Sequence, residues 1–232
     1  MSSPSCLIES IESNEIDTGA TKISSLKVLK QTFGFDEFRD GQWDVIDCVL
    51  QGKDSLILLP TGGGKSICYQ LPALMMKGLT IVVSPLISLM QDQVQNLTKK
   101  GVKAVALTSG MSFRDIDREL DNCIFGKTKF LYVSPERLKT ELFIERVKKM
   151  NVGLLTVDEA HCISQWGHDF RPDYTRLAEF REQMGNPTTI ALTATATPDV
   201  QKDIVRQLGL EPDEIELFHE GINRPNLELV VH

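Results

Sequence analysis

The sequence TGGGKS, at residues 61–66, has the composition and spacing of a phosphate cradle. Successive glycines let backbone N–H groups point inward together, and a helix that begins after them adds its positive N-terminus. Lys65 would reach the β- and γ-phosphates of a nucleotide, and the Ser66 hydroxyl would join a Mg²⁺ shell. The usual P-loop pattern begins with a glycine where this chain has Leu59, but residues 61–66 keep the cradle. The predicted cradle residues are Thr61, Gly62, Gly63, Gly64, Lys65 and Ser66.

Two adjacent carboxylates, Asp158 and Glu159, lie at the end of a second apolar run, GLLTVD. Carboxyl ends of parallel strands meet at one edge of a sheet, so we expect Asp158 to lie beside the cradle. There Asp158 and Ser66 would hold Mg²⁺, while Glu159 would orient and deprotonate an attacking water. One carboxylate would thus bind the metal and the other would act as the base, which is the arrangement expected for nucleotide hydrolysis.

Seven short apolar segments, rich in β-branched residues, alternate with helical patterns along the chain. They are continuous apolar runs, which are typical of strands covered on both faces. This alternation predicts an α/β fold in which a mostly parallel central sheet carries helices on both faces. The predicted strands are residues 55–59, 80–84, 103–107, 129–134, 153–158, 188–193 and 214–218.

Helix boundaries are marked by Ser, Thr, Pro and Gly. A Ser–Pro or Thr–Pro pair predicts an N-cap followed by the first helical residue, and it occurs at Ser84, Ser134 and Thr197. Gly209 follows the last apolar position of a helical pattern and predicts a C-terminal cap. The apolar stripes of two predicted helices are Leu86, Met90, Val94 and Leu97, and Val200, Ile204 and Leu208.

The 232 residues carry 32 acidic and 25 basic side chains, a formal net charge of -7. No general basic field would hold a polyanion, so any nucleic acid must be bound through local geometry. The five cysteines contain no CxxC pair, which argues against a disulfide framework or a zinc ribbon and favours a reducing compartment. Without a bilayer-spanning apolar run or a secretory signal, we expect an intracellular protein, in the nucleus or the bacterial cytoplasm.

Together, TGGGKS, DEAH (158–161) and LTATAT (192–197) resemble the motifs of superfamily 2 helicases, and three further stretches resemble the RecQ family. The resemblance implies a RecA-like P-loop NTPase lobe that uses ATP and Mg²⁺, and it adds His161 to the catalytic group. The first stretch, FGFDEFRDGQ, resembles the family's adenine motif. By resemblance, Gln42 contacts the base edge, while Phe35 and Arg39 pack against the base face.

The second stretch, HCISQWGHDFRPDY (161–174), resembles an aromatic-rich loop peculiar to RecQ proteins. Trp166 and Phe170, amid polar residues, offer stacking faces to unpaired bases, with Arg171 beside them. A capped hydrophobic patch is the alternative. The two histidines and the cysteine of this loop match no standard zinc spacing, and the family's zinc lies in a later domain. We therefore expect no metal at this loop and no zinc in this segment.

The third resemblance lies in VSPLISLMQDQV (83–94) and YVSPERL (132–138), which are similar to the family's strand-contacting motifs. Helix N-termini bind phosphate without needing net positive charge, so these segments are expected to contact single-stranded DNA. In the family, the LTATAT segment couples nucleotide state to strand binding; tight packing of its alanines is equally compatible. The predicted nucleic-acid contacts outside the aromatic loop are Ser84, Pro85, Ser134, Thr193 and Thr195.

The resemblance covers roughly residues 25–227. We expect residues 1–22 to be a polar, disordered leader, residues 23–222 to form the first RecA-like lobe, and residues 223–232 to begin a crossover to a second lobe that this sequence lacks. In the family that lobe supplies an arginine finger, which is worth on the order of 10³ to 10⁵ in rate. The resemblance thus implies the first motor lobe of a 3′-to-5′ DNA helicase of repair and recombination, weak or inactive by itself.

Three alternatives stay open at this point. A P-loop kinase would use the cradle and Mg²⁺, but it would not need Glu159, the adenine motif or the aromatic loop. A non-hydrolysing, ATP-gated clamp would bind nucleic acid without turnover. An RNA-directed helicase is the third, because base stacking does not report the 2′-hydroxyl.

Overall fold

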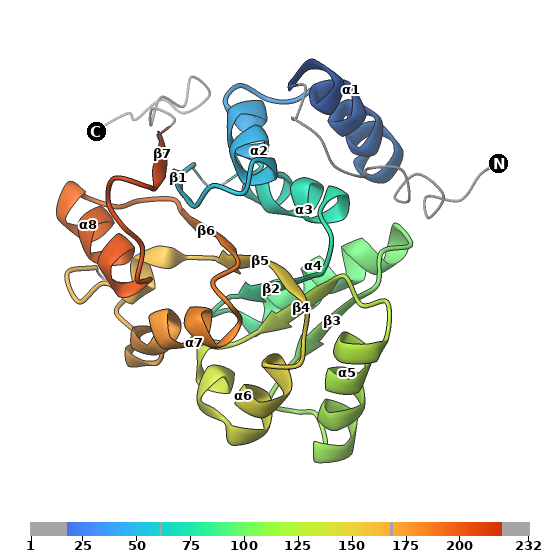
Figure 1. Ribbon diagram of the computed structural model, residues 1–232, viewed down its shortest axis with the longest axis vertical. Helices are drawn as coiled ribbons and strands as arrows, with labels where there is room; N and C mark the ends of the chain where they lie inside the picture. Colours follow the sequence, from blue (N-terminus) through green and yellow to red (C-terminus); the bar gives the residue numbers. More distant parts are fainter. Residues whose placement is uncertain (1–17, 61, 168, 220–232) are drawn as a thin grey trace, which may run out of the picture.

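The computed structural model describes residues 18–60, 62–167 and 169–219, and these residues form one seven-stranded sheet. The strands are β1 (Ser55–Leu58), β2 (Leu79–Val83), β3 (Ala104–Leu107), β4 (Phe130–Val133), β5 (Val152–Val157), β6 (Thr188–Thr193) and β7 (Glu216–His219). They lie in the order β3-β4-β2-β5-β6-β1-β7, and every neighbouring pair is parallel (Figure 1). The predicted parallel sheet is confirmed.

The carboxyl ends of four adjacent strands form the edge that carries the candidate chemistry. In the sheet β2, β5, β6 and β1 are consecutive neighbours. Just beyond them, the Leu59 N–H donates to the Thr193 carbonyl at 3.1 Å. In the same way the Asp158 N–H donates to the Val83 carbonyl at 2.9 Å. The cradle after β1 and the carboxylates after β5 therefore leave the sheet at one edge, with β6 between them.

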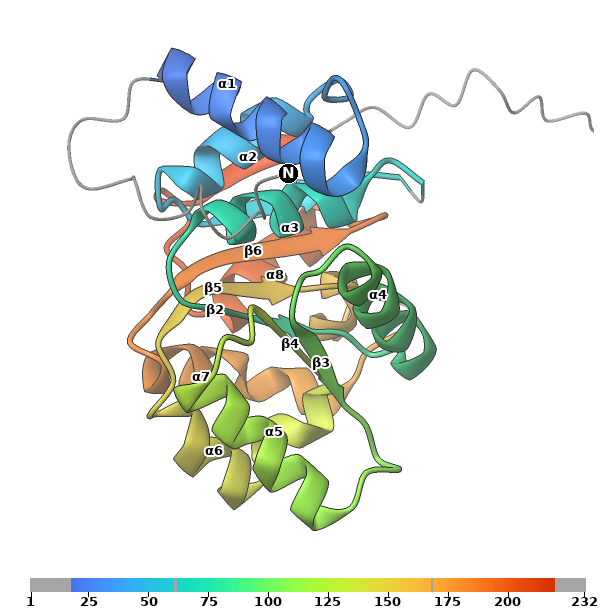
Figure 2. The same ribbon diagram turned by 90° about the vertical axis from the view of Figure 1, so that its right-hand side faces the viewer.

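Helices cover both faces of the sheet, as continuous apolar strands require. The helices are α2 (Gln42–Leu50), α3 (Lys65–Met75), α4 (Ile87–Lys99), α5 (Phe113–Phe125), α6 (Glu141–Val147), α7 (Leu177–Gln183) and α8 (Pro198–Gln207), with the short 3₁₀ helices η4 (Pro135–Lys139), η5 (Ala160–Ile163) and η6 (Pro172–Arg176). One core joins α2, α3 and α4 to the sheet, and a second joins α5 to α8 to the other face (Figure 2). Within residues 18–60, 62–167 and 169–219, no helix is long and apolar enough to cross a membrane.

An additional layer lies outside α2 and α3, where α1 (Thr18–Val28) continues into the π-helix η3 (Leu29–Phe33) (Figure 2). Leu29 is 1% exposed and packs with Ile46 and Leu71. Residues 18–22 belong to the helix α1, where the sequence analysis expected a disordered segment, and the predicted bounds of the leader stay a prediction. Residues 1–17 and 220–232, and with them the rest of the leader and the crossover prediction, lie outside the described residues.

The predicted boundaries of α8 are confirmed. The Thr197 hydroxyl accepts a hydrogen bond from the Val200 N–H at 3.4 Å, and Pro198 stands at the start of the helix. After the helix ends, Gly209 adopts a left-handed backbone with φ of 63°. These local signals act through neighbours three or four residues away, which is why the sequence alone reveals them.

The prediction of an N-cap at Ser84 is wrong. The helix α4 begins only at Ile87, and the Ser84 hydroxyl donates to the Asp158 carboxylate at 3.4 Å. Ser134 does precede a helix with proline in its first turn, but η4 is a five-residue 3₁₀ helix, and among the described residues the Ser134 side chain makes no capping bond. A long-range partner at the sheet edge thus replaces the local cap that Ser84 was expected to form.

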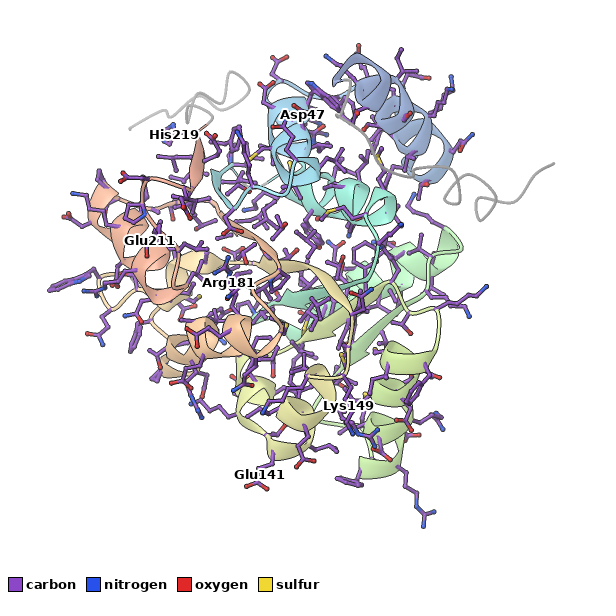
Figure 3. All side chains as sticks on the ribbon, viewed as in Figure 1. Asp47, Glu141, Lys149, Arg181, Glu211 and His219 are labelled. Carbon is purple, nitrogen blue, oxygen red and sulfur yellow. The ribbon has the colours of Figure 1, made fainter. Side chains whose placement is uncertain are left out.

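A partly buried charged network joins the amino ends of β1 and β6. Asp54 accepts hydrogen bonds from the Thr189 N–H at 2.7 Å and from Arg181 at 2.8 Å. The Arg181 Nε also donates to the Thr189 hydroxyl at 3.0 Å. The Arg181 side chain is only 14% exposed, whereas Figure 3 shows Glu141 at the rim of the molecule. Burial raises the pKa of Asp54, and the Thr189 N–H and the Arg181 charge oppose that rise, so the carboxylate depends on Arg181.

We expect Arg181→Met to lower the free energy of unfolding by about 3 kcal/mol, because it leaves a partly buried carboxylate without its counter-charge. Urea denaturation followed by circular dichroism measures this loss. Arg176→Met is the matched control, since Arg176 pairs with Glu179 at the surface, where the two side chains are 50% and 61% exposed. The control should change stability by less than about 0.5 kcal/mol. Equal losses in the two variants would contradict the role given to the Asp54 network.

Candidate nucleotide-binding site

The turn between β1 and α3 depends on glycine for its shape. Gly62 and Gly64 have left-handed backbones, with φ of 84° and 83°, which residues with a Cβ rarely adopt. A Cβ on Gly63 would lie 2.9 Å from the Pro60 carbonyl oxygen. Because α3 begins directly after Gly64, its first backbone N–H groups lie at this turn. The backbone thus has the geometry expected of an anion cradle; Thr61 lies outside the described residues.

The Asp158 carboxylate lies beside the cradle. It accepts hydrogen bonds from the Glu159 N–H at 3.0 Å and from the Ser84 hydroxyl at 3.4 Å. Burial and the nearby Glu159 charge raise the pKa of Asp158, whereas the Glu159 N–H, the Lys65 charge and the Ser84 hydroxyl oppose that rise. The Lys65 charge acts on Asp158, and both residues follow strands that end at the same edge of the sheet. That these two residues form one catalytic site stays a prediction. A raised pKa also means that an added cation would stabilise the ionised carboxylate, and Mg²⁺ fits this requirement.

Glu159 and His161 are tied to the end of β6. Glu159 adopts a left-handed backbone, φ 49°, just before η5. The His161 Nδ1 lies 3.3 Å from the Glu159 Oε2 and 3.0 Å from the Thr193 Oγ1. Because the Thr193 hydroxyl donates its only proton to the Thr195 carbonyl, we infer that the His161 Nδ1 is the donor to Thr193. The imidazole therefore connects the predicted base to the LTATAT segment.

The three residues predicted to bind adenine line one side of the cradle. Phe35 is 52% exposed, and with Arg39 and Gln42 it borders a cavity of about 90 Å³. Arg39 donates to the Gly62 carbonyl at 2.5 Å, and the Gln42 Nε2 donates to the Gly64 carbonyl at 3.3 Å. The Gln42 Oε1 accepts from the Arg39 N–H at 2.9 Å. Each amide atom of Gln42 keeps one further hydrogen-bonding position, so its contact with a base edge stays a prediction.

The aromatic loop presents Trp166 to solvent. Trp166 is 76% exposed, while Phe170 is half-buried. The loop is braced by Arg171, which donates to the Pro85 carbonyl at 3.4 Å and pairs with Asp169 at 3.5 Å. Along α8, Trp166 also borders a cavity of about 410 Å³. An exposed aromatic ring on a braced loop is the arrangement that base stacking needs.

Two other predicted nucleic-acid contacts are buried. Ser84 is 2% exposed and Thr193 is 0% exposed. Their hydroxyls bond to the carboxylate site and its neighbours, so the structure places them inside the protein and not on a DNA-facing surface. Pro85 and Ser134 are partly exposed and Thr195 is exposed, so their predicted contacts stay predictions.

A partly buried polar chain beside the cradle was missed by the sequence analysis. The Ser66 hydroxyl accepts from Gln93 of α4 at 3.2 Å, and Gln93 accepts from Gln70 of α3 at 2.8 Å. Gln70 also donates to the Tyr132 hydroxyl at 3.2 Å, which lies 3.1 Å from the Tyr69 hydroxyl. A glutamine inside the largely apolar helix sequence KSICYQLPALM is the signal that could have marked this chain.

The aromatic loop also brings together three side chains with metal-binding atoms. One such atom from each of His161, Cys162 and Asp169 lies within 4.8 Å of the others. Burial raises the pKa of the Cys162 thiol to about 12, so the thiol stays protonated at neutral pH, which disfavours metal binding. The expectation of no metal here stays a prediction; His168, which it also concerned, lies outside the described residues.

Comparison with known sequences agrees with this geometry. The family model of DEAD/DEAH box helicases matches residues 39–204. The chain is 46% identical over 205 residues to the probable ATP-dependent DNA helicase RecS of Bacillus subtilis, a match that covers 88% of this chain and 41% of RecS. It is 45% identical over 206 residues to the ATP-dependent DNA helicase RecQ of Pasteurella multocida, with 89% of this chain and 32% of RecQ covered. The chain therefore spans about two fifths or less of these relatives.

Among solved structures, the helicase domain of Pyrococcus furiosus Hef is similar to this chain with a TM-score of 0.62 and 22% identity. The match covers 81% of this chain and 39% of that one, and at this identity it concerns the fold alone. It confirms the predicted RecA-like fold, and the relatives confirm the resemblance to RecQ helicases. The family match contains Lys65, the DEAH sequence and Thr193, the residues that meet at the carboxyl edge of the sheet. The chain belongs to the DEAD/DEAH box helicase family.

Proposed function

We propose that this chain is the nucleotide-binding motor lobe of an ATP-dependent DNA helicase. The observation that carries the proposal is that the glycine cradle with Lys65 and the adjacent carboxylates Asp158 and Glu159 leave the sheet at one carboxyl edge. A lysine, a metal-binding carboxylate and a base on one sheet edge are the parts that phosphoryl transfer to water needs. The names of RecS and RecQ support ATP as the nucleotide and DNA as the partner.

Each group at the edge has a separate proposed role. The amides of the cradle and Lys65 would bind the phosphates, and Ser66 and Asp158 would hold Mg²⁺. When bound, Mg²⁺ neutralises charge on the phosphate oxygens. Glu159 would orient the attacking water and accept its proton. His161, bonded to Thr193, would keep Glu159 connected to β6.

Nucleic acid would be contacted on the surface that begins at the aromatic loop. Trp166 and Phe170 would stack on unpaired bases, and Arg171 would hold the loop against the β2–α4 connection. We propose that Pro85, Ser134 and Thr195 line the same path. Movement in the 3′-to-5′ direction and a role in repair and recombination are part of this proposal, and they rest on the resemblance to RecQ proteins.

We propose further that this chain by itself binds ATP weakly and hydrolyses it slowly. In the family a second RecA-like lobe forms the other wall of the cleft and adds an arginine, worth on the order of 10³ to 10⁵ in rate. The chain spans at most 41% of the two relatives compared above. We do not expect it to separate strands by itself, because translocation needs two lobes that close on each other.

In a protein that joins this chain to a second lobe, Glu159→Gln should reduce DNA-stimulated ATP hydrolysis by about 10² or more, because a general base contributes 10²–10⁴. Its affinity for ATP should stay near that of the wild type. Lys65→Ala should lose ATP binding itself. Phosphate release and the affinity for a fluorescent ATP analogue are the two measurements.

Glu141→Gln is the matched control, since Glu141 lies at the rim of the molecule (Figure 3). An unchanged rate in Glu159→Gln would refute the proposed role of Glu159. Transfer of phosphate to a small acceptor, with no free phosphate, would replace the helicase proposal with a kinase.

Asp158→Asn should stabilise the chain at pH 7 while it removes Mg²⁺-dependent ATP binding. Burial raises the folded-state pKa of Asp158 above the ordinary value of 3.8 for an aspartate. The folded state therefore binds this proton more tightly than the unfolded state does. The contribution of Asp158 to the free energy of unfolding is therefore largest below pH 3.8 and is lost as the pH rises through the raised folded-state pKa. Asp158→Asn should melt at a higher temperature than the wild type at pH 7, and this difference should vanish toward pH 4. Thermal melts at the two pH values measure it. Asp213→Asn, at an exposed turn, is the control; a lower melting temperature for Asp158→Asn at pH 7 would contradict the burial argument.

Trp166→Ala should weaken binding of single-stranded DNA by about 1–3 kcal/mol, the value of one base stacked on an aromatic ring. Fluorescence anisotropy of a labelled oligonucleotide measures the affinity. Phe113→Ala is the matched control, because Phe113 is 69% exposed at the start of α5. Wild-type affinity in Trp166→Ala would rule out stacking. Tighter binding of RNA than of DNA with the same sequence would favour an RNA-directed helicase.

A further inference from the structure

Both predicted Mg²⁺ ligands are held by polar groups from one segment, residues 84–99, which contains the β2–α4 connection and α4. At its start the Ser84 hydroxyl donates to the Asp158 Oδ2 at 3.4 Å. Within α4, the Gln93 Nε2 donates to the Ser66 Oγ at 3.2 Å. Ser66 and Asp158 follow β1 and β5, which are separated by β6 in the sheet. The segment therefore bridges two parts of the site that are not adjacent in the sheet.

The orientation of the Gln93 amide is determined by a hydrogen bond from Gln70. Its Oε1 accepts a hydrogen bond from the Gln70 Nε2 at 2.8 Å, so the Nε2 must point toward Ser66. Gln70 is 4% exposed and also donates to the Tyr132 hydroxyl at 3.2 Å. Burial raises the pKa of Tyr132 to about 12, which keeps this hydroxyl neutral at physiological pH. A buried chain of neutral groups thus holds the Gln93 donor in place.

The hydrogen bond from Gln93 determines which lone pair and proton of the Ser66 hydroxyl remain available to a ligand. A serine hydroxyl has one proton and two lone pairs. The Gln93 N–H occupies one lone pair, which leaves the second for a cation and the proton for an acceptor. Because the donor is fixed, the Ser66 side chain is held in one rotamer before any ligand arrives. Outer partners of this kind orient metal ligands and strengthen metal binding.

We propose that Gln93 is a positioning residue for the Mg²⁺-binding hydroxyl of Ser66, and that Ser84 acts in the same way on Asp158. This inference rests on the proposed binding of ATP and Mg²⁺, and it deepens that proposal. Between these two residues the segment exposes Leu86 and Ile87, 46% and 38% exposed, beside Pro85 of the proposed nucleic-acid surface. A shift of this segment would therefore move both metal ligands together.

A Mg²⁺ titration of ATP binding tests this role on the chain itself. The affinity for a fluorescent ATP analogue is measured first in EDTA and then over increasing Mg²⁺. Gln93→Met should raise the Mg²⁺ concentration needed for half-maximal enhancement by about tenfold, the lower end of the effect of outer partners on metal affinity. Its affinity in EDTA should stay near that of the wild type. Gln91→Met, at an exposed position of α4, is the matched control.

Two further variants separate positioning from folding. Ser84→Ala removes a single oxygen from a buried site and should also raise the Mg²⁺ requirement. In a Ser66→Ala background, Gln93→Met should have no additional effect, because its target is gone. Unchanged Mg²⁺ titrations in both Gln93→Met and Ser84→Ala, or a full Gln93→Met effect without Ser66, would overturn the inference. Binding by the wild type that is indifferent to Mg²⁺ would instead overturn the proposed function.

Discussion

The ionised Asp158 carboxylate is the group on which the rest of the site depends. Burial and the Glu159 charge disfavour its ionised form, and three groups offset part of that cost: the Glu159 N–H, the Lys65 ammonium and the Ser84 hydroxyl. They follow β5, β2 and β1, so only a sheet in which these strands share one carboxyl edge brings them together. In another strand order the same carboxylate would be a buried, unpaired charge, which proteins avoid. The environment of Asp158 therefore depends directly on the order of the strands in the sheet.

The cradle and the adenine side are packed as a single unit. A Cβ on Gly64 would lie 2.3 Å from the Gln42 Nε2, so glycine is required there for close approach as well as for its left-handed backbone. Arg39 reaches across to the Gly62 carbonyl. The backbone that would receive the phosphates is thus shaped by the residues that would receive the base. Through these contacts, the residues proposed to bind the base also support the backbone proposed to bind the phosphates of the same nucleotide.

An acidic chain that binds nucleic acid must do so through shape and local contacts. The formal net charge of -7 leaves no long-range attraction to a polyanion. What the structure offers is an exposed indole at Trp166, braced by Arg171 against the β2–α4 connection. Stacking on an aromatic ring works on any unpaired base and needs no net positive charge at the ring. The loop also follows the DEAH residues directly, so the residues proposed for strand contact and those proposed for hydrolysis lie in one short segment.

Local chemistry made the strands, the α8 caps, the glycine cradle and the DEAH carboxylates predictable, because apolar runs and backbone strain act over a few residues. The sequence also indicated the parallel sheet, and with it the meeting of Lys65 and Asp158. Burial of individual hydroxyls was not predictable. Ser84 and Thr193 are of residue types that are common at the surface, yet both are buried at the ends of central strands. The Gln93–Ser66 bond and the packing of α1 on α2 and α3 likewise join residues far apart in the chain. Such contacts depend on which elements become neighbours, and only the tertiary structure decides that.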